Sequence, residues 1–262
     1  MKTIEKILYT AFACMFLLAA CDVGFMSKDS AAGDNSGQGG SMARFTINGN
    51  YMYTVDQQTL KMFDLSDPAQ PNYLERKNQN LRFGIETIFS MDTLLFIGSQ
   101  DGMYIYDVTR QEFPQLLSFV SHIRSCDPVV ASGQYAYVTL SSDRQWCGNT
   151  SNVLNIYDIS NLRYPVLKVS ESLNHPKGLG IDGNKLFVCE SRLGVKVYDV
   201  SDPLNPRWID DWTHQPETVN AVAYDVIPVN GLLLVTTDRG LYQFDYTGEK
   251  LRFVSKIITV KK

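Results

Sequence analysis

The chain lacks an apolar run long enough to cross a membrane as a helix, because none of its stretches reaches roughly 18 apolar residues. Cysteine is scarce, and five residues are too few for a disulfide-based scaffold. Positive charge is not in excess, because 28 Asp and Glu outnumber 24 Lys and Arg, so nucleic acid has no general electrostatic reason to bind. A hydrophobic fraction of 44% excludes a collagenous or largely disordered protein. These values predict a globular chain with a sizeable core, either soluble or merely anchored.

Residues 1–20 have the layout of a secretory signal, with Lys2 and Lys6 ahead of an apolar stretch. The stretch ends in Leu18-Ala19-Ala20-Cys21, which resembles the bacterial lipobox, where the cysteine is acylated and becomes the mature N-terminus. The resemblance implies a signal peptide over residues 1–20, a lipid on Cys21 and an outer-membrane lipoprotein that faces the periplasm or the cell surface. A plain secretory signal with a chance cysteine, or an anchor helix, is the alternative.

The segment that follows is expected to be a flexible tether. Residues 22–41 are mostly Gly, Ser, Asp, Asn and Ala, which cannot pack a core. About twenty such residues have a root-mean-square reach of roughly 25 Å. We therefore expect a lipidated cysteine and a tether over residues 21–41, with the folded domain beginning at residue 42.

One motif recurs five times along the rest of the chain. Each copy reads aromatic, Asp, apolar, hydroxyl, and its aspartates are 43, 51, 41 and 46 positions apart. The copies are Phe63-Asp64-Leu65-Ser66, Tyr106-Asp107-Val108-Thr109, Tyr157-Asp158-Ile159-Ser160, Tyr198-Asp199-Val200-Ser201 and Phe244-Asp245-Tyr246-Thr247. A proline follows seven residues after the aspartate in the first four copies, so the repeat extends beyond four letters.

Each repeat has room for four short strands. In the fourth repeat, residues 176–182, 185–190, 194–201 and 206–212 are separated by turn-forming residues, and the third of these strands is apolar on both faces. A sheet of this kind needs a neighbour on each side, and repeated sheets packed face to face in a closed ring form a β-propeller. The sequence therefore predicts an all-β fold: a five-bladed β-propeller of four-stranded antiparallel blades over residues 42–262.

These units resemble LVIVD repeats, the propeller-type repeats of bacterial secreted and surface lipoproteins. The likeness extends over residues 42–260 and is closest at Gly49-Asn50-Tyr51-Met52-Tyr53 and at Gly194-Val195-Lys196-Val197-Tyr198-Asp199-Val200-Ser201-Asp202-Pro203. The fifth unit departs, with Thr247-Gly248 in place of a Ser-Asp-Pro turn. The resemblance implies the fold, but the family is defined by its repeat and brings no shared catalytic residue.

The five motif aspartates suggest a ring of carboxylates for a cation, but their context favours a structural role. Each is followed two residues later by Ser or Thr, a position at which Asp accepts a backbone N–H and closes an Asx turn. We therefore expect these aspartates to end strands.

Strand order assigns the loops to two faces of the ring. The variable face is the one at which the innermost strands begin and the second strands join the third, and its loops differ from blade to blade. It holds His122, His175 and His214, which are all the histidines of the chain. Their spacing contains no local ligand pair, so we expect turn-forming or exposed histidines, with no metal and no cofactor.

A glycan-active hydrolase is the alternative function. Glu86 and Asp127 both stand near the start of an innermost strand, and cleavage of a glycoside needs two carboxyls roughly 5–10 Å apart. Blade four has Lys177 at the corresponding place, and the sequence contains no nucleophile elbow, P-loop, dinucleotide-binding or zincin motif. We therefore expect a protein without catalytic activity.

Three cysteines remain in the mature domain. Cys189 stands in a second strand where other repeats place Val55, Ile97 or Val235, which predicts a buried free thiol. Because an exported chain meets an oxidising compartment, we expect Cys126 and Cys147 to form a disulfide.

The longest interval between motif aspartates places its surplus in residues 141–152, on the variable face of blade three. This polar loop contains Arg144 and Trp146, residue types that dominate contact energies, although Trp146 folded back over the blade edge is the alternative reading. We expect a monomeric binding or scaffolding module for an envelope protein or a glycan, held at the membrane by its lipid and without a nucleic-acid partner. The candidate binding residues are Glu86, His122, Arg124, Asp127, Arg144, Trp146, His175, Lys177 and His214.

Overall fold

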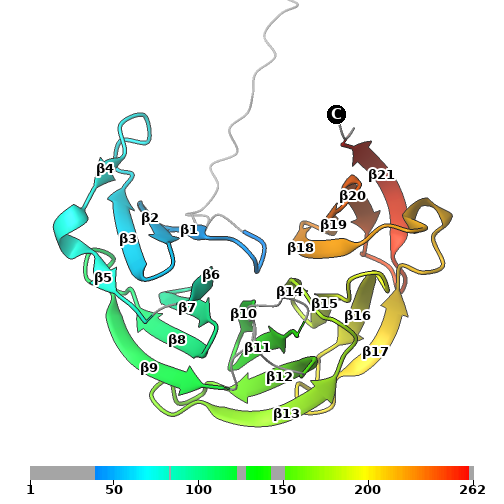
Figure 1. Ribbon diagram of the computed structural model, residues 1–262, viewed down its shortest axis with the longest axis horizontal. Helices are drawn as coiled ribbons and strands as arrows, with labels where there is room; N and C mark the ends of the chain where they lie inside the picture. Colours follow the sequence, from blue (N-terminus) through cyan, green and yellow to red (C-terminus); the bar gives the residue numbers. More distant parts are fainter. Residues whose placement is uncertain (1–38, 83, 123–127, 143–150, 260–262) are drawn as a thin grey trace, which may run out of the picture. The chain divides into compact units, whose positions relative to one another are not determined.

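The computed structural model describes residues 39–82, 84–122, 128–142 and 151–259. Their strands form five antiparallel sheets, one for each predicted repeat, which follow one another in chain order around a common centre (Figure 1). The predicted all-β, five-bladed propeller is therefore confirmed. Within these same residues, no helix has the length and apolar character needed to cross a membrane.

The five blades are numbered in chain order. Blade one contains β1 (Phe45–Asn48), β2 (Tyr51–Val55), β3 (Thr59–Asp64), β4 (Asn72–Tyr73) and β5 (Gln79–Asn80). Blade two contains β6 (Ile85–Met91), β7 (Leu94–Ser99), β8 (Gly102–Asp107) and β9 (Gln115–Ser121). Blade three contains β10 (Val129–Ser132), β11 (Tyr135–Leu140), β12 (Val153–Asp158) and β13 (Val166–Ser172). Blade four contains β14 (Leu179–Asp182), β15 (Lys185–Cys189), β16 (Val195–Asp199) and β17 (Arg207–Asp211). Blade five contains β18 (Ala223–Val229), β19 (Leu232–Thr237), β20 (Gly240–Asp245) and β21 (Arg252–Ile258).

Blade one departs from the four-stranded pattern at its outer edge. The short strands β4 and β5 both pair with β3, and the 3-10 helix η1 (Glu75–Lys77) lies between them. Lys77 on η1 forms an ion pair with Glu112 of blade two. The outer strand of blade one is thus divided into β4 and β5 by η1, which contacts blade two. A second 3-10 helix among the described residues, η2 (Pro216–Thr218), precedes blade five.

The repeated motif marks the same local structure in every blade. Each motif aspartate accepts the backbone N–H of the hydroxyl residue two positions later, at 2.7–3.0 Å. Hydrogen bonds from that residue lower the pKa of each aspartate. In blades two to five, the pairing of the third and fourth strands also shifts register directly before the motif aromatic. The predicted Asx turns are therefore confirmed, and four of them follow a β-bulge.

Packing between blades differs between the middle and the ends of the array. The described residues form four apolar clusters, which join blades one and two, two and three, three and four, and four and five. None of these clusters joins blade five to blade one. The second strands of blades two to four are buried almost throughout, whereas β2 of blade one alternates between buried and partly exposed residues. Blades two to four therefore have an apolar contact with a neighbouring blade on each side, as the sequence predicts. Each terminal blade has such a contact on one face, and its other face is uncovered.

The uncovered faces of the two terminal blades carry polar groups. On blade one, Lys61 forms an ion pair with Asp56 at 2.7 Å. On blade five, Gln243 accepts a hydrogen bond from Ser255 at 2.6 Å, where the preceding blades have Met62, Ile105, Ile156 and Val197. Polar outer faces are typical of terminal units in repeat proteins, because these faces meet water.

Candidate ligand-binding site

A cavity of about 530 Å³ lies where the innermost strands of the five blades begin, on the variable face. Every blade contributes to its lining, either from an innermost strand or from the residues beside it. The lining residues are Met42, Arg44, Glu86, Thr87, Pro128, Ser141, Pro176, Lys177, Tyr224, Asp225 and Thr236. The volume falls within the range of small-molecule sites.

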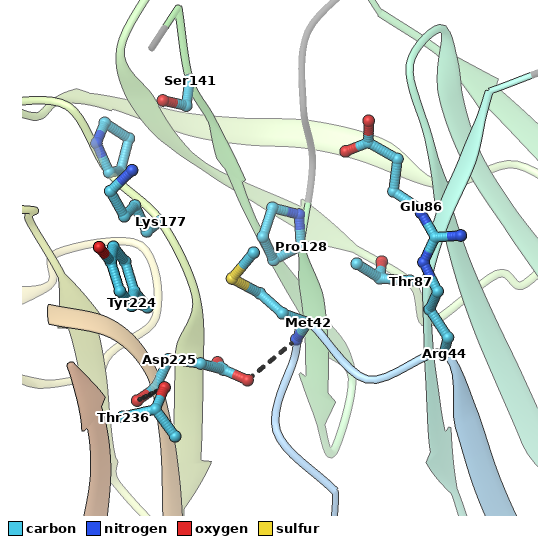
Figure 2. A pocket seen from close by; sticks show the side chains of 11 residues that line it. Met42, Arg44, Glu86, Thr87, Pro128, Ser141, Lys177, Tyr224, Asp225 and Thr236 are labelled. Atoms are coloured by element: carbon cyan, nitrogen blue, oxygen red, sulfur yellow. Dashed lines mark hydrogen bonds between the residues drawn. The ribbon is translucent and has the colours of Figure 1, made fainter. Parts of the chain in front are cut away.

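The cavity has two polar sides (Figure 2). Lys177, Tyr224 and Asp225 lie on one side, and Arg44 and Glu86 lie on the other. The side chain of Met42 and the ring of Pro128 lie between them. The Lys177 ammonium stands 5.7 Å from the centre of the Tyr224 ring, and Tyr224 is 39% exposed. Charges of both signs and an accessible aromatic ring therefore face one space.

Asp225 is held through both of its carboxylate oxygens. The Ser41 hydroxyl donates to its Oδ1 at 3.0 Å, and the Met42 backbone N–H donates to its Oδ2 at 3.2 Å. Burial raises the pKa of Asp225 to about 6, and these hydrogen bonds oppose that rise. Both carboxylate oxygens are thus engaged by the segment that leads into blade one.

Sequence reasoning found part of this lining. It placed Glu86 and Lys177 at the channel mouth, and the structure brings both into the cavity, with Gln100 donating to Glu86 at 3.3 Å. It missed Arg44, Tyr224 and Asp225. The innermost pairings of blades two and five have the same register shift, between Ile85 and Thr87 and between Ala223 and Asp225. A count of residues from the hairpin turn therefore places Tyr224 at the position of Glu86, and Asp225 one residue later.

The three histidines are not among the lining residues. His175 is exposed and has a positive φ of 51°, as suits a turn ahead of Pro176. His214 Nδ1 lies 3.8 Å from Asp210 Oδ1, and the backbone N–H of His122 donates to Asp101 at 3.2 Å. In the portion of the chain that the structure describes, no group of three or more His, Cys, Asp or Glu side chains is placed to hold a metal ion.

Several predicted positions lie outside the described residues. They are Cys21, Arg124, Cys126, Asp127, Arg144, Trp146 and Cys147. Their described neighbours do reach the cavity, because Pro128 follows Asp127 and Ser141 begins the long loop of blade three.

Cys189 is fully buried and free, in the cluster between blades four and five, as predicted. Burial raises the pKa of its thiol well above the ordinary value. A protonated, inaccessible thiol has no route to nucleophilic chemistry, so Cys189 serves as a small core residue.

Comparison with known protein families finds a match to two parts of the chain. The family model described as LVIVD repeat matches residues 39–78 and 123–171, which fall in blades one and three. The segment that begins at Gly194, whose residues are among the most similar to the LVIVD signature, lies outside both matches. In blades two, four and five, the assignment of a repeat is supported by the strands and Asx turns that all five blades share. No curated protein sequence matches the chain.

Solved structures share the fold at low sequence identity. A functionally unknown protein from Desulfotomaculum acetoxidans is 12% identical with a TM-score of 0.66, and the match covers 88% of this chain and 72% of that one. A protein from Lactobacillus plantarum is 12% identical with a TM-score of 0.58, covering 80% and 68%. Apo AztD from Citrobacter koseri is 10% identical with a TM-score of 0.56, covering 79% of this chain and 62% of AztD. Likeness at this level shows the fold alone.

The raised pKa of Asp225 predicts a pH dependence of stability. Because the folded protein holds this proton up to about pH 6 and the unfolded chain releases it near pH 4, the carboxyl's contribution to the free energy of unfolding falls as pH rises between these values. Asp225→Asn should remove that dependence, so the melting temperature of the variant relative to the native protein should rise between pH 4 and pH 6.5. Thermal unfolding of both proteins across this range measures the difference. Parallel curves would show that the carboxyl titrates as it does in water.

Proposed function

Because this chain is a five-bladed propeller that carries LVIVD repeats, we propose that it is a cell-envelope lipoprotein whose propeller is a non-catalytic binding module for an envelope protein or a glycan. The observation that supports this most is the cavity at the centre of the variable face, to which all five blades contribute. Binding sites commonly lie on loops that a rigid scaffold holds in place.

The lining suits a polar ligand. Arg44 and Lys177 offer donors, Glu86 offers an acceptor, and the ring of Tyr224 offers a flat apolar surface. Hydroxyl groups of an oligosaccharide or amides of a peptide would find partners on both sides of the cavity. Neither a single sign of charge nor a continuous apolar wall dominates, which argues against a nucleotide or a lipid chain.

The geometry gives hydrolysis less support. A glycosidase needs one carboxyl that donates a proton to substrate and a second that acts as base or nucleophile. Asp225 has the raised pKa that suits an acid, but both of its oxygens face Ser41 and Met42 of the protein itself. Although Asp225 lines the cavity, the hydrogen bonds to both of its oxygens favour a structural role over proton transfer to a substrate.

We further propose that residues 141–152 of blade three extend the binding surface. The base of this loop is closed by hydrogen bonds from Ser142 to Asn152 at 3.1 and 3.2 Å, and Ser141 lines the cavity. Trp146 and Arg144 lie on this loop in the sequence, and a disulfide between Cys126 and Cys147 would reduce the entropy lost when the loop binds. We therefore place the partner on the cavity and this loop together.

Anchoring is the second part of the proposal. The lipobox-like Leu18-Ala19-Ala20-Cys21 supports a lipid on Cys21, and the described chain begins at Gly39, three residues before the cavity-lining Met42. The intervening segment of 17 residues would tether the propeller within roughly 25 Å of its anchor.

Cys21→Ser should release the protein from membranes, because acylation would be its attachment. Fractionation of cells should find the native protein with membranes and the variant in the soluble fraction, and mass spectrometry of the native protein should find a diacylated Cys21. An unmodified N-terminus downstream of Cys21 would disprove the lipoprotein assignment.

Tyr224→Ala should weaken binding at least tenfold, because it removes the aromatic surface of the cavity. The partner is first captured by cross-linking and pull-down from native cells, or identified on a panel of envelope glycans, and its affinity is then titrated. Trp208→Ala is the matched control, since Trp208 also carries a lysine over its ring, with Lys196 at 5.9 Å, but is 61% exposed on the outer strand β17. Both variants should keep the native melting temperature.

Equal affinity of Tyr224→Ala and the native protein would exclude the cavity as the binding site. The double variant of Glu86→Ala and Asp127→Ala separates binding from catalysis. Turnover of an envelope glycan by the native protein that this double variant abolishes would replace the binding module with a hydrolase.

A further inference from the structure

The described residues begin with a short segment at the centre of the propeller, residues 39–43, which we call the strap. Its middle is a tight turn, in which the Ala43 N–H donates to the Gly40 carbonyl at 3.0 Å. The Ala43 carbonyl then accepts the Ile88 N–H of β6 at 2.9 Å. The strap therefore reaches blade two before the chain enters β1.

Ser41 fastens the strap to two other blades. Its side chain is completely buried, and its Oγ donates to Asp225 of β18 at 3.0 Å and accepts the Leu179 N–H of β14 at 2.7 Å. The Met42 N–H adds the second bond to Asp225, at 3.2 Å (Figure 2). One hydroxyl and one carboxylate thus link the strap to blades four and five.

Two glycines make the slot for this carboxylate. A Cβ on Gly40 would lie 2.0 Å from Asp225 Oδ2, and a Cβ on Gly178 would lie 2.0 Å from Oδ1. No side chain larger than hydrogen fits on either side while Asp225 keeps its place. The fit between strap and blades is therefore specific in shape as well as in hydrogen bonding.

The strap also forms part of the cavity. Met42 and Arg44, which flank its end, are lining residues, and Asp225 faces the same space (Figure 2). The terminal blades share none of the apolar clusters of the described residues, and the hydrogen bonds from the strap to Asp225 join blade one to blade five.

We propose that Ser41 and Asp225 are positioning residues that latch the strap across the inner ends of blades four and five and thereby set the cavity wall that Met42 and Arg44 provide. The latch would do the work of a fifth joint at the centre of the propeller. Its role in ligand binding rests on the proposed function, whereas the latch itself does not.

The amide protons of Met42 and Leu179 report the latch directly, because their acceptors are Asp225 and Ser41. Hydrogen exchange measured by NMR on the whole exported protein should find both amides protected. Ser41→Ala should raise both exchange rates at least tenfold and together. The Cys189 amide, which donates to the Gly178 carbonyl inside blade four at 2.9 Å, should keep its native rate.

Gly40→Ala tests the slot, because its methyl group would displace the carboxylate and should release the same two amides. Gly248→Ala is the matched control, since a Cβ there meets no atom within 4 Å. Asp225→Asn keeps the shape of the side chain and one acceptor, so it should give a smaller rise in exchange than Ser41→Ala. It also provides a foldable variant if the others are too unstable.

The double variant of Ser41→Ala and Asp225→Ala tests whether the two residues act as one unit. Its exchange rates at Met42 and Leu179 should be close to those of either single variant, because each change opens the same latch. The NMR signal of the Met42 methyl group should move in every latch variant and stay in place in Gly248→Ala.

Three results would overturn the proposal. They are full protection of both amides in Ser41→Ala, an equal rise at the Cys189 amide, and an unmoved Met42 methyl signal in a variant whose strap is released. The first result would show that Ser41 does not hold the strap. The second would show that the substitution loosens blade four as a whole. The third would show that the strap does not set the shape of the cavity. A failure to find any ligand would contradict the proposed function but would change none of these readouts.

Discussion

The constraint on which this structure depends is that the three middle sheets are apolar on both faces. Such a sheet is stable only between two others, because either face would otherwise expose several large apolar side chains to water. Four apolar clusters meet this need between successive blades. Five blades are thus joined by four apolar clusters. Because no fifth cluster among the described residues joins the terminal blades, the polar pairs and the strap lie there.

At the two ends of the array, polar chemistry replaces apolar packing. The uncovered faces of blades one and five carry polar pairs, which are Lys61 with Asp56 and Gln243 with Ser255. At the centre, Asp225 receives the strap through Ser41 and Met42. The cavity lies at the same place, so the residues that join the two ends also border the space in which we propose that a ligand binds.

The repeat could be read from sequence because its chemistry is local. An aspartate two residues before a hydroxyl specifies an Asx turn without help from distant residues, and five such turns at intervals of 41 to 51 residues set the number of blades. Cys189 could be assigned for a similar reason, since it ends the second strand of its blade as Val55 does, and both residues are buried. Features that one repeat unit determines by itself were therefore predictable.

The strap and Asp225 could not be predicted, because they depend on contacts across more than 180 positions of the chain. Gly39, Gly40 and Ser41 have the composition of a linker, and the sequence places the start of the domain at residue 42. In the structure, Ser41 is as buried as any core residue. In the sequence, Asp225 resembles a polar interruption of an apolar strand. Its role as the acceptor for the strap depends on Gly40 and Gly178, which lie on either side of its carboxylate in the structure.

The central claim is that the terminal blades meet through the strap and not through a fifth apolar joint. Two methionines of blade one test it, since Met52 lies on the uncovered face and is partly exposed, while Met62, one strand away, is fully buried in the joint with blade two. Hydrogen peroxide converts accessible methionine to the sulfoxide, and peptide mapping by mass spectrometry gives the rate at each position. The account predicts that Met52 is oxidised at least tenfold faster than Met62. Equal, slow oxidation of both would show that blade five covers blade one and that the ring is closed by a fifth joint.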